Sequence, residues 1–190
     1  TLDSSVLGKV TSQINVEDIQ NQQLLSGDLV IEKILLTNIQ PFIGTLEQLN
    51  GDIKGQLALA GSLKEPLING ELNVDSINLE GATLPVSLQN SQVNIAFNNQ
   101  SATVTGELKD REGGALKLSG GVDWHADLPD VNLQLQGNEF FVRAQQDVTF
   151  KVSPELTMSL KNNAFNLEGQ VVVPWGRIAI EELPEGAVQV

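Results

Sequence analysis

Apolar residues alternate with polar ones along most of the chain, which is the pattern of a β-strand with one apolar face. In residues 53–61 the odd positions hold Ile, Gly and Leu, while Lys54 and Gln56 lie between them. The same alternation recurs in residues 68–74, 93–97, 104–108, 116–124, 131–137, 148–152, 156–160 and 165–173. Turn-forming residues separate these segments at the spacing of hairpins, so the pattern predicts an all-β protein built as a meander.

Glycines share the alternate positions of the apolar residues in these predicted strands. We call these positions the apolar phase, and the glycines that occupy them in-phase glycines. A phrase of two apolar residues followed by an in-phase glycine recurs at residues 57–61, 116–120, 133–137 and 165–169. A strand glycine on the packed face usually marks a bend or a close approach of another backbone. Because a repeated unit favours a structure that grows along one axis, we expect one curved sheet with a narrow apolar inner face.

The apolar phase alone permits two interpretations of that inner face. It is either the core of a closed structure, or an open groove that holds acyl chains or another extended apolar ligand. The in-phase glycines and the repeated unit favour the groove. Residues 29–36 differ, because they are apolar in both phases, and we expect this segment to be covered on two sides.

The absence of a low-complexity linker predicts a single elongated domain over residues 1–190. Residues 1–50 form a part that can pack differently from the repeat region. Both ends of the chain lie inside patterned sequence, which favours a piece of a larger protein.

The composition excludes several classes of partner. The chain has 24 acidic and 11 basic residues, a formal net charge of −13 and no cluster of basic residues. Nucleic acids and anionic bilayer surfaces both require such clusters, so neither is an expected partner. No cysteine is present, which excludes disulfides and thiolate chemistry. No apolar run approaches the ~20 residues of a membrane-spanning helix.

No constellation of residues in the sequence predicts catalysis. The single histidine, His125, lies near Asp123, Asp127 and Asp130, but no serine has the glycine pattern of a nucleophile elbow. The aspartates do not have the spacing of a calcium-binding loop. We expect His125 to be an exposed residue at a turn, and we predict no enzyme activity, metal site or cofactor.

Two stretches of the sequence resemble a known family. Residues 42–79, FIGTLEQLNGDIKGQLALAGSLKEPLINGELNVDSINL, resemble the repeat unit of the TamB and AsmA-like proteins of Gram-negative envelopes. The run from Ile53 to Leu72 has the pattern of this repeat: an apolar residue, Gly, Leu, Leu and Gly at alternate positions, then Pro, then Gly and Leu. Residues 171–183, VVVPWGRIAIEEL, resemble a segment of the C-terminal domain in the TamB branch of this family.

The resemblance implies a fold and a set of partners that the alternation does not show. It implies a long β-sheet curled into a groove with an apolar inside, the "β-taco" of bridge-like lipid-transfer proteins. It implies a parent protein anchored in the inner membrane that crosses the periplasm and works with TamA, an outer-membrane protein. It also implies roles in autotransporter and outer-membrane protein assembly and in phospholipid transport.

We therefore expect a non-enzymatic segment whose groove conducts phospholipid acyl chains. A chaperone-like module that binds unfolded outer-membrane strands, in the groove or at its edge, and a structural spacer with a closed core are the alternatives. The residues expected to line the groove share the apolar phase. They are Leu57, Leu59, Leu72, Val74, Val104, Leu108, Leu116, Leu118, Val122, Leu133, Leu135, Val148, Phe150, Val152, Leu156, Met158, Leu160, Phe165, Leu167, Val171 and Val173.

Overall fold

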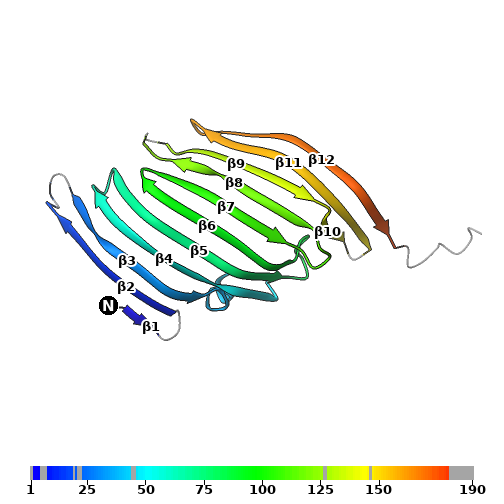
Figure 1. The fold of residues 1–190 in the computed structure, drawn as a ribbon, viewed down its shortest axis with the longest axis horizontal. Helices are drawn as coiled ribbons and strands as arrows, with labels where there is room; N and C mark the ends of the chain where they lie inside the picture. Colours follow the sequence, from blue (N-terminus) through cyan, green and yellow to red (C-terminus); the bar gives the residue numbers. More distant parts are fainter. Residues whose placement is uncertain are drawn as a thin grey trace, which may run out of the picture.

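Twelve strands of the computed structural model form one antiparallel sheet (Figure 1). The structure describes residues 2–4, 8–18, 20, 23–43, 46–125, 128–145 and 147–179. The strands are β1 (Leu2–Ser4), β2 (Gly8–Glu17), β3 (Leu24–Leu35), β4 (Gln48–Gly61), β5 (Pro66–Glu80), β6 (Leu88–Asn99), β7 (Ser101–Lys109), β8 (Ala115–Asp123), β9 (Asp130–Asn138), β10 (Phe140–Gln145), β11 (Val148–Lys161) and β12 (Ala164–Ile178). Two short 3₁₀ helices, η1 (Leu36–Asn38) and η2 (Gln40–Phe42), lie between β3 and β4.

The sheet is a meander in which neighbouring strands along the chain are neighbours in space. The order runs from β1 to β9 without a crossover, and β9 and β10 both pair with the same strand, β11. Glu139, with φ of 47°, separates β9 from β10. Among the described strands β12 pairs with β11 alone, so the sheet stays open. The predicted curled all-β sheet is confirmed.

The predicted alternation is visible in the exposure of the side chains. In residues 53–61 of β4 and 131–138 of β9, the apolar-phase positions are half-buried and the polar-phase positions are exposed. Within the described residues four apolar side chains are buried, those of Leu49, Ala102, Phe140 and Pro154. A closed sandwich core would bury most of its inner-face residues. The apolar side of this sheet is therefore not closed off as a core.

The in-phase glycines lie opposite large apolar residues on the adjacent strands. Gly70 pairs with Leu57, and Gly120 lies between Val104 and Leu133. Gly70 has φ of +130° and Gly120 has φ of +150°, and a Cβ at either position would overlap a carbonyl oxygen of the adjacent strand. Since L-residues rarely adopt these angles, the glycines permit strand geometry that other residues would resist.

Contacts between strands that are not neighbours show how strongly the sheet curls. The indole N–H of Trp124, after β8, donates to the carbonyl of Pro66 in β5 at 3.2 Å. On a flat sheet, strands three places apart would be separated by roughly 14 Å. The Trp124 ring also packs edge-on against Phe97, with ring centroids 6.4 Å apart. The curl and this side chain together bring the two segments into contact.

The opposite ends of the strands are joined by a second set of contacts. The backbone N–H of Arg143 in β10 donates to the carbonyl of Pro85 in the β5–β6 loop at 2.7 Å. The Arg111 guanidinium, in the β7–β8 turn, forms a two-pronged ion pair with Glu80, at 3.1 and 2.8 Å. These contacts link β5, β7 and β10 at one rim of the sheet.

A buried carboxylate organises the same rim. Asp110 Oδ1 accepts hydrogen bonds from the backbone N–H groups of Glu112 (2.7 Å) and Gly114 (2.8 Å). Its Oδ2 accepts one from the N–H of Phe141 in β10 at 2.5 Å. The Asp110 side chain thus stabilises the β7–β8 turn by hydrogen bonds within it and connects the turn to β10 by a hydrogen bond.

The expectation that residues 29–36 are covered on two sides is wrong. None of their apolar side chains is buried, and Leu35 is 42% exposed. The cause is a shift in register between β3 and β4, where Ile31 pairs with Gly55 but Ile34 pairs with Ile53. This β-bulge moves the apolar phase from odd to even positions. Leu29, Ile31 and Ile34 therefore share the apolar face, while Val30 and Leu35 lie on the opposite face, paired with Gln56 and Asp52.

We predict that Gly120→Ala lowers the free energy of unfolding by about 1–3 kcal/mol, because the new Cβ would strain φ and overlap the Asn132 carbonyl. Gly176→Ala is the matched control, since its Cβ would meet Phe150 at an ordinary 3.7 Å. Urea unfolding measures both changes. Equal midpoints for the two variants would contradict the role assigned to Gly120.

Candidate functional site

The candidate site is the apolar face, which we define by three rows of directly opposed residues that cross the sheet from β4 to β12. Directly opposed residues of an antiparallel pair lie on the same face. The rows are Leu57, Gly70, Phe97, Ala102, Val122, Val131, Leu160 and Phe165; Gly55, Leu72, Ile95, Val104, Gly120, Leu133, Met158 and Leu167; and Ile53, Val74, Val93, Gly106, Leu118, Leu135, Leu156 and Gly169.

The cross-strand pairs bring nearly all the predicted groove residues onto this face. Leu59 is two positions from Leu57, and Leu108 pairs with Leu116 beside the third row. Val148, Phe150, Val152 and Val171 continue the same phase along β11 and β12. Val173 is the exception, because it lies in a β-bulge of β12. On either side of it, Val172 pairs with Ser153 and Trp175 pairs with Lys151. Val173 and Pro174 therefore lie together opposite a single residue, Val152.

None of the predicted groove residues is buried. Those in β4 to β11 are half-buried, and those in β12 are exposed, up to 67% for Phe165. Soluble proteins rarely present continuous apolar patches of more than a few hundred Å² without a binding role. The apolar face is therefore a feature of the described residues that calls for a ligand or a partner.

The sequence-based list missed several residues of this face. Ile53, Val93, Ile95, Phe97 and Val131 lie in the same rows as the predicted residues. All of them follow the period-2 alternation, so a list that took every apolar residue at these alternate positions would have included them. Trp124 was also missed, although its ring covers Phe97 at the rim of the face.

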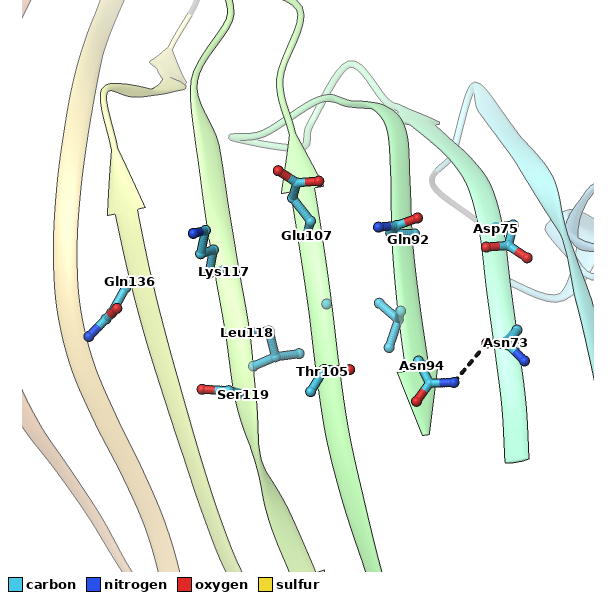
Figure 2. Close-up of a pocket in the computed structure, with 12 residues that line it drawn as sticks. Asn73, Asp75, Gln92, Asn94, Thr105, Glu107, Lys117, Leu118, Ser119 and Gln136 are labelled. Carbon is cyan, nitrogen blue, oxygen red and sulfur yellow. Dashed lines mark hydrogen bonds between the residues drawn. The ribbon is translucent and has the colours of Figure 1, made fainter. Parts of the chain in front are cut away.

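The opposite face of the sheet is polar and carries a hollow of about 510 Å³ (Figure 2). Amide, hydroxyl and charged side chains from β5 to β9 make up most of its lining, and Val93, Gly106 and Leu118 of the third row complete it. Asn94 donates to Asn73 across β5 and β6 at 2.7 Å. Glu107 pairs in register with Gln92 on one side and Lys117 on the other. These side chains stay hydrated, so the two faces of the sheet differ sharply in the ligands they favour.

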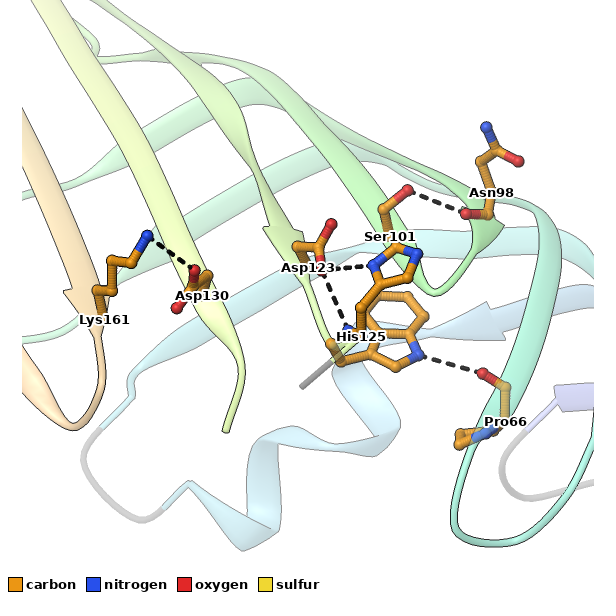
Figure 3. Close-up of polar contacts among 8 residues, drawn as sticks. Pro66, Asn98, Ser101, Asp123, His125, Asp130 and Lys161 are labelled. Atoms are coloured by element: carbon orange, nitrogen blue, oxygen red, sulfur yellow. Dashed lines mark hydrogen bonds and ion pairs between the residues drawn. The ribbon is translucent and has the colours of Figure 1, made fainter. Parts of the chain in front are cut away.

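Ser101, Asp123 and His125 lie near one another at the rim (Figure 3). His125 Nδ1 lies 2.5 Å from Asp123 Oδ1, and hydrogen bonds from the His125 ring and backbone lower the pKa of the Asp123 carboxyl. The Ser101 hydroxyl instead donates to the carbonyl of Asn98 at 2.9 Å. A catalytic triad needs the serine hydroxyl on the histidine, and this arrangement lacks that bond.

The described residues hold no group of three or more side chains that could bind a metal ion. Of the aspartates considered for calcium, Asp127 lies outside the described residues, and Asp130 pairs with Lys161 at 3.4 Å. In the described part of the chain, no helix is long and apolar enough to cross a membrane.

The fold and the apolar face define a class of elongated, curled β-sheet proteins whose apolar side is left open. A family model described as the TamB N-terminal domain matches residues 1–74, and one described as the TamB C-terminal domain matches residues 105–190. The chain belongs to the TamB family, as the resemblance of residues 42–79 and 171–183 predicted.

A curated relative supports the same assignment. The chain is 29% identical over 181 residues, or 95% of its length, to "Translocation and assembly module subunit TamB" of Haemophilus influenzae. It spans 14% of the length of that relative. No solved structure matches the chain.

We predict that Leu133→Arg leaves the sheet folded, with a loss of about 1–3 kcal/mol in the free energy of unfolding. Leu133 is half-buried on the apolar face, so an arginine there can extend its charge to water. Phe140→Arg should unfold the protein, because Phe140 is 1% exposed. Circular dichroism and urea unfolding test both. If Leu133→Arg unfolds the chain as Phe140→Arg does, the face is a closed core.

Proposed function

We propose that this chain is a non-enzymatic segment of an envelope protein whose apolar face acts as a groove for phospholipid acyl chains. The observation that supports it is the apolar face itself, which crosses the sheet from β4 to β12 without a described layer over it. Burial of apolar area is worth about 25 cal/mol per Å² before entropic costs. An acyl chain laid along the rows would cover this area.

The dimensions of the face suit an extended apolar ligand. Eight strand positions lie between β4 and β12 inclusive, because β9 and β10 share one. At about 4.8 Å between neighbouring strands, the rows extend roughly 35 Å. The hydrocarbon core of a whole bilayer, two acyl chains thick, is about 30 Å. The face is therefore longer than a single acyl chain.

The chemistry of the face suits movement as well as binding. The rows contain Leu, Ile, Val, Phe, Met, Ala and Gly without a charged residue. Apolar contacts are not directional, so an acyl chain can slide from one row to the next without breaking a specific hydrogen bond. Net movement would follow a gradient or an energy source outside these residues.

We extend the role of the relative to this chain in the same proposal. The relative is named as a subunit of a translocation and assembly module. We place this chain in the periplasm, as part of a parent protein anchored in the inner membrane. Its partner would be the outer-membrane protein TamA, in the assembly of outer-membrane proteins and autotransporters.

Photo-crosslinking residues placed at Leu133 and Phe150 in living cells should yield lipid adducts, because both side chains lie on the apolar face. A crosslinker at Gln134 is the matched control, since this neighbour of Leu133 is exposed on the polar face. Mass spectrometry of the adducts identifies the cargo. Lipid adducts of equal yield at Gln134, or none at any position, would contradict the conduit, and the latter would favour a spacer.

A second candidate function is a chaperone-like site for unfolded outer-membrane strands, which the edge of the sheet favours. Every residue of β12 is exposed, and its large apolar residues include Leu167 (52%), Val172 (55%) and Ile178 (72%). An extended peptide can add to such an edge by backbone hydrogen bonds. Its apolar side chains would continue the rows of the apolar face.

If the second function holds, a peptide with alternating apolar residues should slow amide hydrogen exchange in β12 and leave β6 unchanged. The expected protection arises from new backbone hydrogen bonds at the edge. A peptide of the same composition with the alternation scrambled is the control. Protection by both peptides, or protection in β6 as well, would argue against strand addition at β12.

A further inference from the structure

Trp175 occupies an unexpected face of the sheet. The strict alternation from Phe165 to Val173 would place it on the apolar face. The register shift at Pro174 instead turns Trp175 to the polar face, where it lies opposite Lys151. β-bulges often re-aim a side chain next to a functional site. The bulge therefore presents a large aromatic ring, 44% exposed, on the hydrated side of the protein.

This ring lines a hollow of about 490 Å³ on the polar face. Sites for small ligands and side chains commonly have volumes of about 300–1,000 Å³. Phe141 and Trp175 flank Lys151 in register on the two adjacent strands. Glu112, Glu139 and Pro174 complete the lining. Strands β10, β11 and β12 thus contribute, together with the β7–β8 turn and the residue between β9 and β10.

Hydrogen bonds hold the acidic wall of the hollow in place. The Asp110 carboxylate accepts from the backbone N–H groups of Glu112 and Phe141, which fixes the turn against β10. The Glu139 N–H donates to the Ser153 hydroxyl at 3.0 Å. These contacts fix the backbone on which both carboxylates stand.

The charges in the hollow favour a cation. Lys151 Nζ lies 3.6 Å from Glu139 Oε2, which partly neutralises that pair. The Glu112 carboxylate has no ion-pair partner among the described residues. With a net charge of −13 on the whole chain, an anionic ligand would be repelled. Aromatic faces attract cations, and tryptophan does so most strongly.

We propose that the hollow receives an arginine side chain of a partner polypeptide. The planar guanidinium stacks on the Trp175 ring, with Phe141 beside it, and donates to the free carboxylate of Glu112. Arginine fits better than lysine, because its flat group can stack and form two parallel hydrogen bonds at once. Tryptophan and arginine are also the residues that most often dominate the energy of protein interfaces.

A titration with N-acetyl-arginine amide tests the proposal on the folded chain, with the Trp175 indole N–H followed by NMR. We expect saturable binding with a dissociation constant of about 1 mM, typical of one side chain in a shallow site. N-acetyl-citrulline amide, the neutral counterpart of similar shape, should bind at least tenfold more weakly.

Three variants locate the site. Trp175→Leu, followed on the backbone N–H of Phe141 in the same hollow, and Glu112→Gln, which keeps the indole as a probe, should each weaken arginine binding at least tenfold. Glu155→Gln should have no effect, because this carboxylate lies outside the hollow and bonds to Gln170. Lipid adducts at Leu133 should persist in all three variants, which separates this proposal from the conduit.

Equal binding of the arginine and citrulline compounds would overturn the proposal. So would an N-acetylglucosamine oligomer that shifts the Trp175 signal where arginine does not, because the hollow would then be a saccharide site. If neither the arginine compound nor the saccharide shifts the Trp175 signal, the proposal is also overturned.

Discussion

The pairing of in-phase glycines with large apolar residues on neighbouring strands is the interaction on which the sheet depends. At Gly70 and Gly120 the absence of a side chain lets the strand take a conformation that a Cβ would block. The leucines opposite them have room without a second layer of protein above. The result is a sheet held together by its own backbone pairing, with apolar side chains on one face that no second layer of the described residues covers.

Period-2 alternation was sufficient to predict most strands from β4 to β12 and the face of their side chains, because side-chain phase depends only on the local backbone. It did not single out β10, and it divided the one strand β11 into residues 148–152 and 156–160. It was not sufficient where the register shifts. Between Ile31 and Ile34, and again between Val172 and Trp175, an additional residue reverses the phase. A bulge of this kind looks like a break in the pattern, so the sequence alone suggested a doubly covered segment in the first case and concealed the outward turn of Trp175 in the second.

The openness of the apolar face could not be predicted from the residues themselves. A buried core and an open groove have the same alternation, since the pattern reports which side chains share a face and not what lies over it. The contacts that shape the rims were also hidden. Trp124 reaches Pro66, and Asp110 reaches Phe141, across 58 and 31 positions of the chain. Such long-range contacts depend on the curl of the whole sheet.

The strand order has a consequence for how the chain acquires its structure. Since each described strand pairs chiefly with the next along the sequence, few contacts must wait for a distant part of the polypeptide. Loop closure between consecutive strands has a low entropic cost. The sheet can therefore form one hairpin at a time, in the order of the sequence. The hydrogen bonds from Trp124 to β5 and from Arg143 to the loop after β5 can form only after the intervening strands have paired, and they then stabilise the curl.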